Sequence, residues 1–352
     1  MQRVTLGASD VEVSEICLGT MTFGNQTDET DGHAQIDRAL DVGITFIDTA
    51  EMYPVNPLHR DTVGRTEEII GNWLVQSGRR DEVQIATKIT GPSQLVRDGA
   101  PFDGAAVAAA IDASLRRLQT DRIDVFQLHW PVRGSYAFRQ NWTYDPSKQD
   151  RAATLAHMED VLTAMGDAQR AGKIRAAGLS NETAWGLTRW CDTADRIGGP
   201  RMAAIQNEYS LLYRLYDTDL AEVAVNEDVT LLAYSPLAAG LLTGKYAGGA
   251  MPDGSRAAVD KANAGVGNLG GRKTARGLAA TAAWHEFAAA NGWDPIHLAI
   301  GWTLTRPFKV VPIIGATSTA QLDHLLAGLG RRPDANLCKA IDRLHREHAQ
   351  TY

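Results

Sequence analysis

Eight short apolar segments of strand length recur along the chain and alternate with segments of helical spacing. Their apolar residues run continuously, which is typical of strands buried on both faces of a parallel sheet. Eight such units in series favour a single (β/α)8 barrel domain over residues 1–352. A doubly wound open sheet stays the alternative, because periodicity does not show closure. The predicted strands are Ile16–Gly19, Thr45–Asp48, Val83–Lys88, Ile123–His129, Ala177–Ser180, Ala203–Asn207, Thr230–Tyr234 and Lys309–Ile313.

The other segments complete this architecture. The N-terminal RVTLG…VEVSE predicts a short hairpin before the barrel, and a helix is expected near the C-terminal end. Asp103 is placed to cap a helix and Gly172 to end one. The predicted helices include Thr30–Val42, Arg65–Ser77, Gly104–Leu118, Thr154–Ala171 and Asp217–Asn226. Three stretches fit neither helix nor strand and are expected as long loops: Gly91–Pro101, Pro131–Asp150 and Ala247–Gly271.

The charge and the cysteines limit the possible partners and the compartment. The formal net charge is −7, so there is no large positive field for nucleic acid or an anionic membrane. No stretch approaches 18 uninterrupted apolar residues, and the start lacks a signal peptide's basic and apolar regions. Cys17, Cys191 and Cys338 form no CxxC motif and suggest a reducing compartment. These features predict a cytoplasmic globular protein, and they leave a homo-oligomer open.

Ionisable residues close three of the predicted strands. Asp48 ends TFID, Lys88 ends VQIATK and His129 ends IDVFQLH. The active sites of (β/α)8 barrels gather at the C-terminal ends of the strands, so these side chains are expected to meet at one mouth. Tyr53 follows five residues after Asp48 and is expected to return beside it. The four residues form a candidate catalytic group.

These four residue types suit hydride transfer to a carbonyl group. The transfer leaves negative charge on oxygen, and a tyrosine hydroxyl with a reference pKa of ~10 needs tuning to supply the proton. Lys88 favours the phenolate and lowers the pKa of Tyr53, and Asp48 pairs with Lys88. His129 donates a hydrogen bond that orients the carbonyl.

Each residue also has a simpler interpretation. A strand-end Asp often caps the next helix, and a buried His is more often a core residue than a catalyst. Lys88 equally fits the Schiff-base lysine of a barrel aldolase. The convergence of all four favours the reductase interpretation.

The loop 131–150 is too aromatic for a linker and is interpreted as a pocket wall. It holds Tyr136, Phe138, Trp142 and Tyr144. Such a wall suits an apolar or sugar-like carbonyl compound. The predicted substrate pocket consists of Tyr53, Trp130, Tyr136, Trp142 and Tyr144.

Two further patterns are set aside. Gly265, Gly267 and Gly270 spell G-x-G-x-x-G, but no strand precedes them, so the match to a dinucleotide fingerprint is attributed to chance and the segment to a lid hinge. His285 and His297 lie on helical patterns without partners at ligand spacing. No metal site is therefore predicted.

The sequence resembles the aldo-keto reductase superfamily, and most closely its Tas-type branch, which lies near the potassium-channel β-subunits. Several motifs match in order from the N-terminal region to the last barrel unit. The segments are LGTMTFG (18–24), FIDTAEMY (46–53), IATK (85–88), LHW (128–130), GKIRAAGLSN (172–181), IQNEYSLL (205–212), LLAYSPLAAGLLTGKY (231–246) and PIIGATSTAQL (312–322).

The resemblance implies NADPH as cofactor and assigns roles to matching positions. Asp48, Tyr53, Lys88 and His129 fall on the family's catalytic tetrad, with Tyr53 as general acid. Tyr234 matches the aromatic residue on which the nicotinamide stacks. The other implied cofactor residues are Gly19, Thr20, Met21, Asp48, Ser180, Asn181, Gln206, Ser235, Pro236, Leu237, Gly240, Leu242, Lys245, Arg256, Gly315, Thr317 and Gln321.

Lys245 and Arg256 match basic positions near the adenosine 2′-phosphate. Two cations in a glycine-rich segment of an acidic protein suit a phosphate dianion, although solvated surface charge is their simpler interpretation. The chain departs from the family where His324 and Leu325 replace an acidic residue or asparagine that contacts adenine. This departure weakens the prediction of a preference for NADPH over NADH.

Two functions of different kinds follow. The first is reduction of an aldehyde or ketone, and the second is a binding module in which slow turnover of NADPH reports redox state to a partner. The complete tetrad favours the enzyme, because a sensor has less need of a proton relay.

Overall fold

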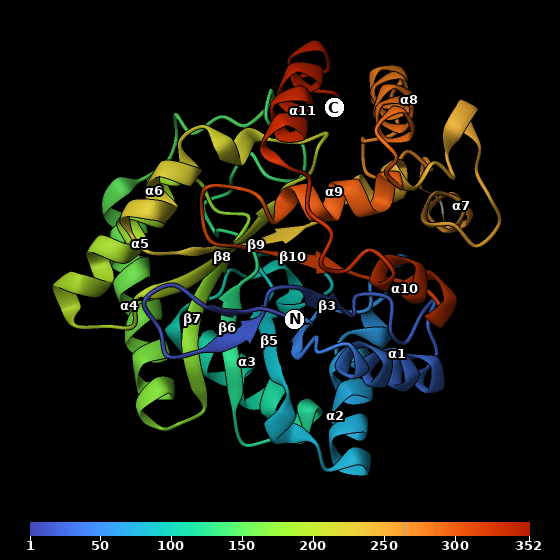
Figure 1. Cartoon of the computed structure of the whole chain (residues 1–352). Coiled ribbons are helices and arrows are strands. Elements are labelled where there is room, and N and C mark those ends of the chain that lie inside the picture. Colours follow the sequence, from blue (N-terminus) through green and yellow to red (C-terminus); the bar gives the residue numbers. More distant parts are fainter. Residues whose placement is uncertain (264) are drawn as a thin grey trace.

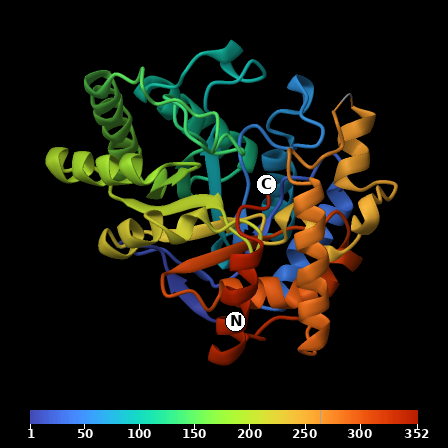
Figure 2. The same cartoon turned by 90° about the horizontal axis from the view of Figure 1, so that it is seen from above.

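The computed structural model describes residues 1–263 and 265–352. Eight parallel strands close into a barrel in the order β10-β3-β4-β5-β6-β7-β8-β9. The predicted (β/α)8 fold is confirmed and the open sheet is excluded. Figures 1 and 2 show the helices arranged around these strands. The barrel strands are β3 Cys17–Gly19, β4 Phe46–Asp48, β5 Gln84–Ile89, β6 Ile123–Leu128, β7 Ile174–Ser180, β8 Met202–Glu208, β9 Thr230–Tyr234 and β10 Val310–Ile314.

The predicted hairpin closes one end of the barrel. Strands β1 (Arg3–Thr5) and β2 (Glu12–Ser14) pair antiparallel. Leu6, Val11 and Val13 pack in one buried cluster with side chains from the beginnings of the barrel strands. The open mouth therefore lies at the other end, where the strands finish.

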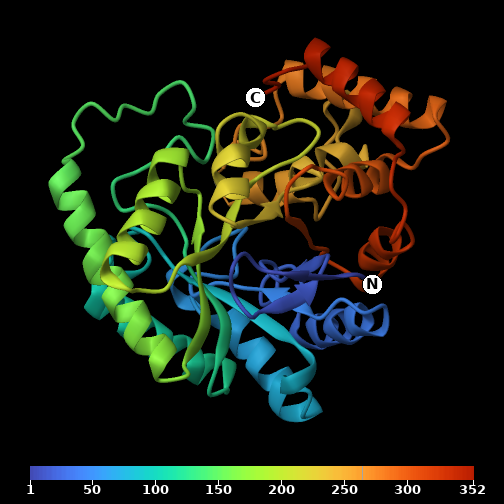
Figure 3. The ribbon, with the colours of Figure 1, turned by 60° about the vertical axis from the view of Figure 1, so that its left-hand side comes forward.

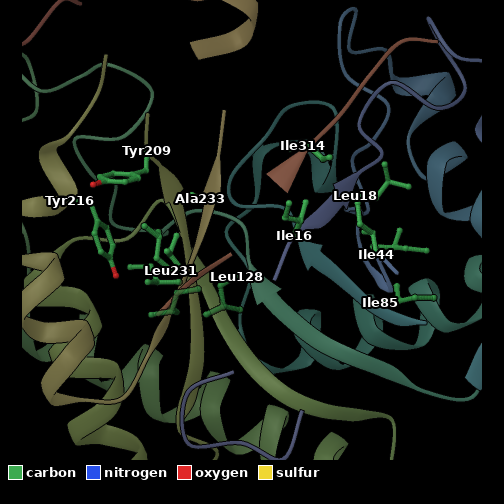
Figure 4. Close-up of a cluster of buried hydrophobic side chains, with 14 of the residues drawn as sticks. Ile16, Leu18, Ile44, Ile85, Leu128, Tyr209, Tyr216, Leu231, Ala233 and Ile314 are labelled. Carbon is green, nitrogen blue, oxygen red and sulfur yellow. The ribbon is translucent and has the colours of Figure 1, made fainter. Parts of the chain in front are cut away.

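The side chains of each barrel strand point alternately into the barrel and outward toward the helices, and so form two separate hydrophobic cores. Phe46 and Ala86 belong to the interior cluster, whereas their neighbours Ile47 and Ile85 belong to the outer cluster under the helices. Figure 4 shows part of this outer layer, including Ile85 and Leu128. Because successive strand residues point to opposite faces, polar residues two positions beyond interior apolar ones face the mouth.

The helices begin and end with the expected chemistry. The Asp103 carboxylate accepts a hydrogen bond from the Ala106 amide at 2.8 Å, and Gly172 has a left-handed φ of 74°. No helix within the described residues is long and apolar enough to cross a membrane. The helices are α1 Glu29–Asp41, α2 Arg65–Ser77, α3 Gly104–Leu118, α4 Arg151–Arg170, α5 Ala184–Ile197, α6 Leu220–Asn226, α7 Arg256–Ala262, α8 Ala275–Ala290, α9 Pro295–Thr303, α10 Thr319–Leu326 and α11 Ala335–Glu347.

The three predicted loops differ in outcome. Gly91–Pro101 holds a 3-10 turn and an isolated bridge between Ser93 and Val96, and Pro131–Asp150 forms the long green loop that leads into α4 in Figure 3. For Ala247–Gly271 the prediction of no helix was wrong, because α7 lies within it, capped by Ser255. The predicted loop also includes residue 264, which lies outside the described residues. The G-x-G-x-x-G motif follows α7 and no strand, which agrees with chance occurrence.

Candidate active site

The four predicted catalytic residues meet at the mouth of the barrel. Lys88 Nζ donates a hydrogen bond to Asp48 Oδ2 at 2.7 Å and lies 4.9 Å from the centroid of the Tyr53 ring. The rings of Tyr53 and His129 stand edge to face, with centroids 5.8 Å apart. All four residues are buried. Side chains that are up to 81 residues apart in the sequence, from Asp48 to His129, thus form one cluster.

The loop after β4 returns Tyr53 to this cluster by running beside β5. The Glu51 amide donates to the Lys88 carbonyl at 3.1 Å. The Glu51 carboxylate accepts from the Thr90 amide at 2.6 Å and from the Arg97 guanidinium at 2.7 Å. These bonds hold the loop that carries Tyr53 against the neighbouring strand.

Asp48 and Lys88 form a buried ion pair, with side chains 4% and 0% exposed. Burial by itself lowers the pKa of Lys88, but the charges of Asp48 and Tyr53 outweigh burial, so that the pKa of Lys88 is raised. The ammonium group also donates to the Thr49 carbonyl at 2.7 Å. Lys88 is therefore a fixed positive charge beside Tyr53.

The pKa of Tyr53 is raised above its ordinary value. Burial is the largest cause, and it outweighs the lowering by Lys88; Asp48 raises the pKa further. Lys88 acts in the predicted direction, but the expected net lowering of the Tyr53 pKa is not found, because the hydroxyl is desolvated. The hydroxyl therefore keeps its proton at neutral pH, as a general acid must.

His129 is held in its neutral form. Burial first, and then the charge of Lys88, lower the pKa of His129 well below its usual value. Its Nδ1 atom is buried and has no hydrogen-bond partner within the described part of the chain. A neutral imidazole has one N–H with which to donate to a carbonyl oxygen.

The structure adds Gln127, which sequence reasoning missed. Gln127 and Gln206 donate to Asp48 Oδ1 at 3.3 and 2.8 Å, and Gln206 Nε2 also donates to Gln127 Oε1 at 3.3 Å. Gln127 lies two positions before His129 in sequence, so strand alternation places both on the inner face. The two amides hold the Asp48 carboxylate on the side opposite Lys88.

Three of the predicted cofactor residues, Ser180, Asn181 and Tyr234, are hydrogen-bonded along the mouth, and Asn181 contacts His129. Asn181 Nδ2 donates to the His129 carbonyl at 2.9 Å, and the Tyr234 hydroxyl donates to Asn181 Oδ1 at 2.8 Å. Ser180 Oγ donates to the Gln206 carbonyl at 2.8 Å. These bonds link the ends of β6 to β9 into one polar wall.

The segment after β9 is a tightly wound loop that carries a lysine. Ser235, Ala239 and Gly240 all have left-handed backbone conformations, with φ of 53°, 55° and 95°. A Cβ on Gly240 would lie 3.1 Å from Lys245 Cε, so glycine lets the lysine lie close against the loop. The predicted residues Pro236, Leu237 and Leu242 belong to this same loop.

Lys245 and Arg256 lie near one another. Burial, and then the charge of Arg256, lower the pKa of Lys245. Burial and the neighbouring Arg272 and Arg139 lower the pKa of Arg256 to about 10. Across residues 1–263 and 265–352, neither Lys245 nor Arg256 forms a salt bridge with a carboxylate. Lys245 is exposed and Arg256 is half-buried, and two neighbouring cations that form no salt bridge in this part of the chain suit a phosphate group.

The predicted residues after β3 and β10 lie beside the tetrad. Thr20 Oγ1 donates to the Asp48 carbonyl at 2.8 Å, and Met21 packs against the cluster that contains Tyr53. A Cβ on Gly315 would lie 2.9 Å from the Gly19 carbonyl oxygen, so the two segments touch. This approach continues the mouth toward α10.

The start of α10 is ordered by its own side chains. Gln321 Oε1 accepts from the Thr317 amide at 3.2 Å, and Ser318 caps the helix. His324, one turn further on, contacts the Asp294 carboxylate of α9 at 2.9 Å. The departure from the family pattern at this position is therefore a contact between two helices.

Of the predicted substrate residues outside the tetrad, Trp130 contacts His129. Its ring centroid is 5.0 Å from that of His129 and 5.8 Å from that of Phe138. Gly91 makes room for the indole, because a Cβ there would lie 2.0 Å from Trp130 Nε1. Trp130 thus forms the wall of the mouth beside His129.

The structure does not bring the other aromatic residues of the loop to Tyr53. Tyr136 borders a small cavity with Tyr213 and Tyr216. Trp142 is 75% exposed, and the Tyr144 hydroxyl is hydrogen-bonded within its own loop. The aromatic composition of the loop 131–150 predicted an ordered loop, but it did not predict the direction in which each ring points.

A second missed residue, Glu208, ties two long loops to the barrel. Its carboxylate accepts from Arg272 at 2.7 and 2.8 Å and from Arg139 at 3.3 Å. Arg139 belongs to the loop after β6, and Arg272 follows the loop that holds α7. Glu208 lies two positions after Gln206, and this spacing was a signal that it faces the mouth.

Comparison with known proteins agrees with this geometry. Residues 15–346 match the Aldo/keto reductase family. The chain is 40% identical to "Protein tas" of Escherichia coli over 98% of both chains. It is 31% identical to "Aldo-keto reductase YhdN" of Bacillus subtilis, over 92% of this chain and 88% of that protein.

A plant relative represents the potassium-channel β-subunits, to which the sequence also has a predicted resemblance. The chain is 30% identical to a "Probable voltage-gated potassium channel subunit beta" of Arabidopsis thaliana, over 92% of this chain and 90% of the relative. The predicted resemblance to the Tas-type branch and to the channel β-subunits is confirmed. The chain belongs to the aldo/keto reductase family.

Proposed function

We propose that this chain reduces an aldehyde or ketone to the alcohol with NADPH, using Tyr53 as the general acid. Family membership supports an oxidoreductase that acts on carbonyl compounds. The observation that carries the finer proposal is the buried cluster around Tyr53: Lys88 Nζ lies 4.9 Å from the centroid of its ring, and the His129 ring lies 5.8 Å away edge to face. The raised pKa of Tyr53 and the lowered pKa of His129 agree with a protonated acid beside a neutral imidazole, as reduction of a carbonyl group requires.

The residues at the mouth fit a nicotinamide dinucleotide phosphate. Tyr234 ends β9 with its hydroxyl held by Asn181, which leaves its ring as a stacking surface. The tight loop from Ser235 onward leads to Lys245 and Arg256, the cation pair without a carboxylate partner. When bound there, NADPH supplies the hydride that is added to the carbonyl carbon.

The chain's own residues account for the rest of the reaction. The substrate oxygen is placed between the Tyr53 hydroxyl and the His129 N–H, and both donate to it. As negative charge develops on that oxygen, Tyr53 transfers its proton and becomes a phenolate. Lys88 stabilises the phenolate, and Asp48, held by Gln127 and Gln206, keeps Lys88 in place. Solvent later returns the proton to Tyr53.

The proposed substrate is a small carbonyl compound that packs against Trp130. The indole lies beside His129 and is therefore next to the reacting carbonyl. We further propose that the chain acts as one catalytic barrel in the cytoplasm. Neither nucleic acid nor a membrane is a proposed partner, given the net charge of −7.

Tyr53→Phe tests the assignment. It removes the proton donor and keeps the ring, so kcat for carbonyl reduction is expected to fall by about 10²–10⁴-fold. NADPH affinity, measured by fluorescence titration, is expected to stay nearly unchanged. Turnover is followed at the nicotinamide absorbance across aldehydes, ketones and oxidised sugars. Tyr144→Phe serves as control, since that hydroxyl bonds within its own loop. Undiminished turnover in Tyr53→Phe would refute the role of Tyr53.

A second candidate is a redox-sensing module, which the similarity to a channel β-subunit supports. A sensor is expected to bind NADPH tightly and to oxidise it slowly with every carbonyl in the panel. The ordered tetrad favours the enzyme. Rapid turnover with any member of the panel decides for the reductase.

A further inference from the structure

Asp294, His297 and His324 lie close together where α9 and α10 meet. Both helices are labelled in Figure 1. Asp294 is the N-cap of α9, His297 lies in its first turn and His324 lies on α10. One candidate ligand atom from each of the three side chains lies within 4.8 Å of the others. None of these residues belongs to the proposed catalytic group.

The hydrogen bonds leave suitable atoms for a metal ion. Asp294 Oδ1 caps the helix by accepting from the Ile296 amide at 2.8 Å, whereas Oδ2 faces His324 Nε2 at 2.9 Å. His297 Nε2 lies 2.7 Å from the His324 carbonyl oxygen. With Nε2–H as donor, the lone pair of His297 is on Nδ1. A hydrogen bond from the second ring nitrogen to a carbonyl is the usual support of a metal-bound histidine.

The position of His297 is built into the packing. Its side chain is buried, and a Cβ on Gly328 would lie 2.3 Å from its ring. Glycine at position 328 therefore makes the space that the imidazole occupies. His324, in contrast, has a side chain that is 53% exposed. The His297 imidazole is thus held in place by packing, whereas the exposed His324 side chain has room to move toward an ion.

We propose that Asp294, His297 and His324 bind a divalent transition-metal ion of the zinc type. Two imidazoles and a carboxylate, with water in the fourth position, form a common coordination set for Zn²⁺. Bonds of about 2.0–2.2 Å place tetrahedral ligand atoms roughly 3.4 Å apart. A rotation of the exposed His324 side chain closes the remaining distance.

Binding of the ion requires one proton to move and leaves the cap of α9 intact. His324 Nε2 exchanges its hydrogen bond to Asp294 for the metal, and its proton moves to Nδ1 or to solvent. Asp294 Oδ2 becomes a ligand while Oδ1 continues to cap α9. Mg²⁺ is a poor fit, because it prefers six oxygen ligands. The ion would tie α10, whose first turn carries the proposed cofactor residue Gln321, to α9.

The test uses the full-length chain after treatment with EDTA, titrated with CoCl₂ and then displaced by ZnCl₂. The visible absorption of Co²⁺ reports its coordination by nitrogen and oxygen. All proteins carry Cys338→Ser, because Cys338 is a partly exposed thiol and could bind these ions itself. We expect one saturable site per chain, zinc displacement of cobalt, and no binding of MgCl₂.

Variants assign the site. His324→Gln keeps a hydrogen-bond donor toward Asp294 but loses the ligand, and Asp294→Asn keeps a good helix cap but loses the charge. Each is expected to weaken Co²⁺ binding by at least about tenfold. His59→Gln, an exposed histidine elsewhere, is expected to leave binding unchanged. The proposal is overturned if no saturable absorption appears, or if His324→Gln binds Co²⁺ as the parent protein does.

Discussion

Replacing Asp48 by asparagine removes one charge from the buried pair and keeps the shape of the side chain. The side chains of Asp48 and Lys88 are 4% and 0% exposed, so water does not compensate the remaining ammonium group. Breaking a buried pair by removing one partner costs about 3–5 kcal/mol. We expect Asp48→Asn to lower the free energy of unfolding at pH 7 by about 3 kcal/mol, the lower end of that range, because the amide oxygen still accepts from Lys88.

A surface pair of the same two residue types provides the control. Lys309 Nζ lies 2.6 Å from Asp228 Oδ1, with side chains 44% and 48% exposed. Such pairs contribute about 0.2–1 kcal/mol, so Asp228→Asn is expected to change stability by less than about 1 kcal/mol. Urea unfolding followed by circular dichroism measures both. Equal losses in the two variants would show that the argument from burial is wrong.

The cost of Asp48→Asn is expected to depend on pH. Without the Asp48 charge, burial becomes the dominant influence and lowers the pKa of Lys88 below its ordinary value. Between that lowered pKa and the unfolded value of ~10.4, the unfolded state binds more protons than the folded state. The stability of the variant therefore rises with pH. A gap to the parent protein that is the same at pH 7 and at pH 9.5 would contradict this reasoning.

Two further predictions concern the cofactor and the pH profile. Lys245→Ala and Arg256→Ala are expected to weaken NADPH binding far more than NADH binding in fluorescence titrations; equal losses would remove the proposed contact with the 2′-phosphate. The ratio kcat/KM for carbonyl reduction is expected to be flat between about pH 6 and 8, because the lowered pKa of His129 and the raised pKa of Tyr53 both lie outside this range. A loss of activity near pH 6.5 would indicate that His129 titrates in the active protein.

Much of the fold was predictable because the barrel strands are buried on both faces. All eight predicted strands are present, and the helices Arg65–Ser77 and Gly104–Leu118 begin and end at the predicted residues. The errors fall where local effects dominate. Helix α6 begins at Leu220, after the irregular backbone of Thr218, and not at Asp217. Helix α7 has only seven residues, too few for a clear period.

The candidate site was predictable where a residue closes a strand. Gln127 and Glu208 point inward by the same strand alternation as His129 and Gln206. They were not singled out from the sequence, because each lies two positions along its strand from the residue that matched the family. The pairing of His297 with His324 has no sequence signal. Their distance of 27 positions becomes a contact only when α9 and α10 pack together.

The N-terminal hairpin limits the face of the barrel from which ligands reach the site. Leu6, Val11 and Val13 cover the end opposite the mouth, and strand side chains such as Val125 and Leu232 fill the barrel interior, so ligands reach the site only from the mouth. On the proposed function, cofactor and substrate therefore both enter from this one face of the barrel. The two loops fastened at Glu208 border that face. On the proposed function, access to the mouth therefore depends on loops that the ion pairs of Glu208 with Arg139 and Arg272 hold in place.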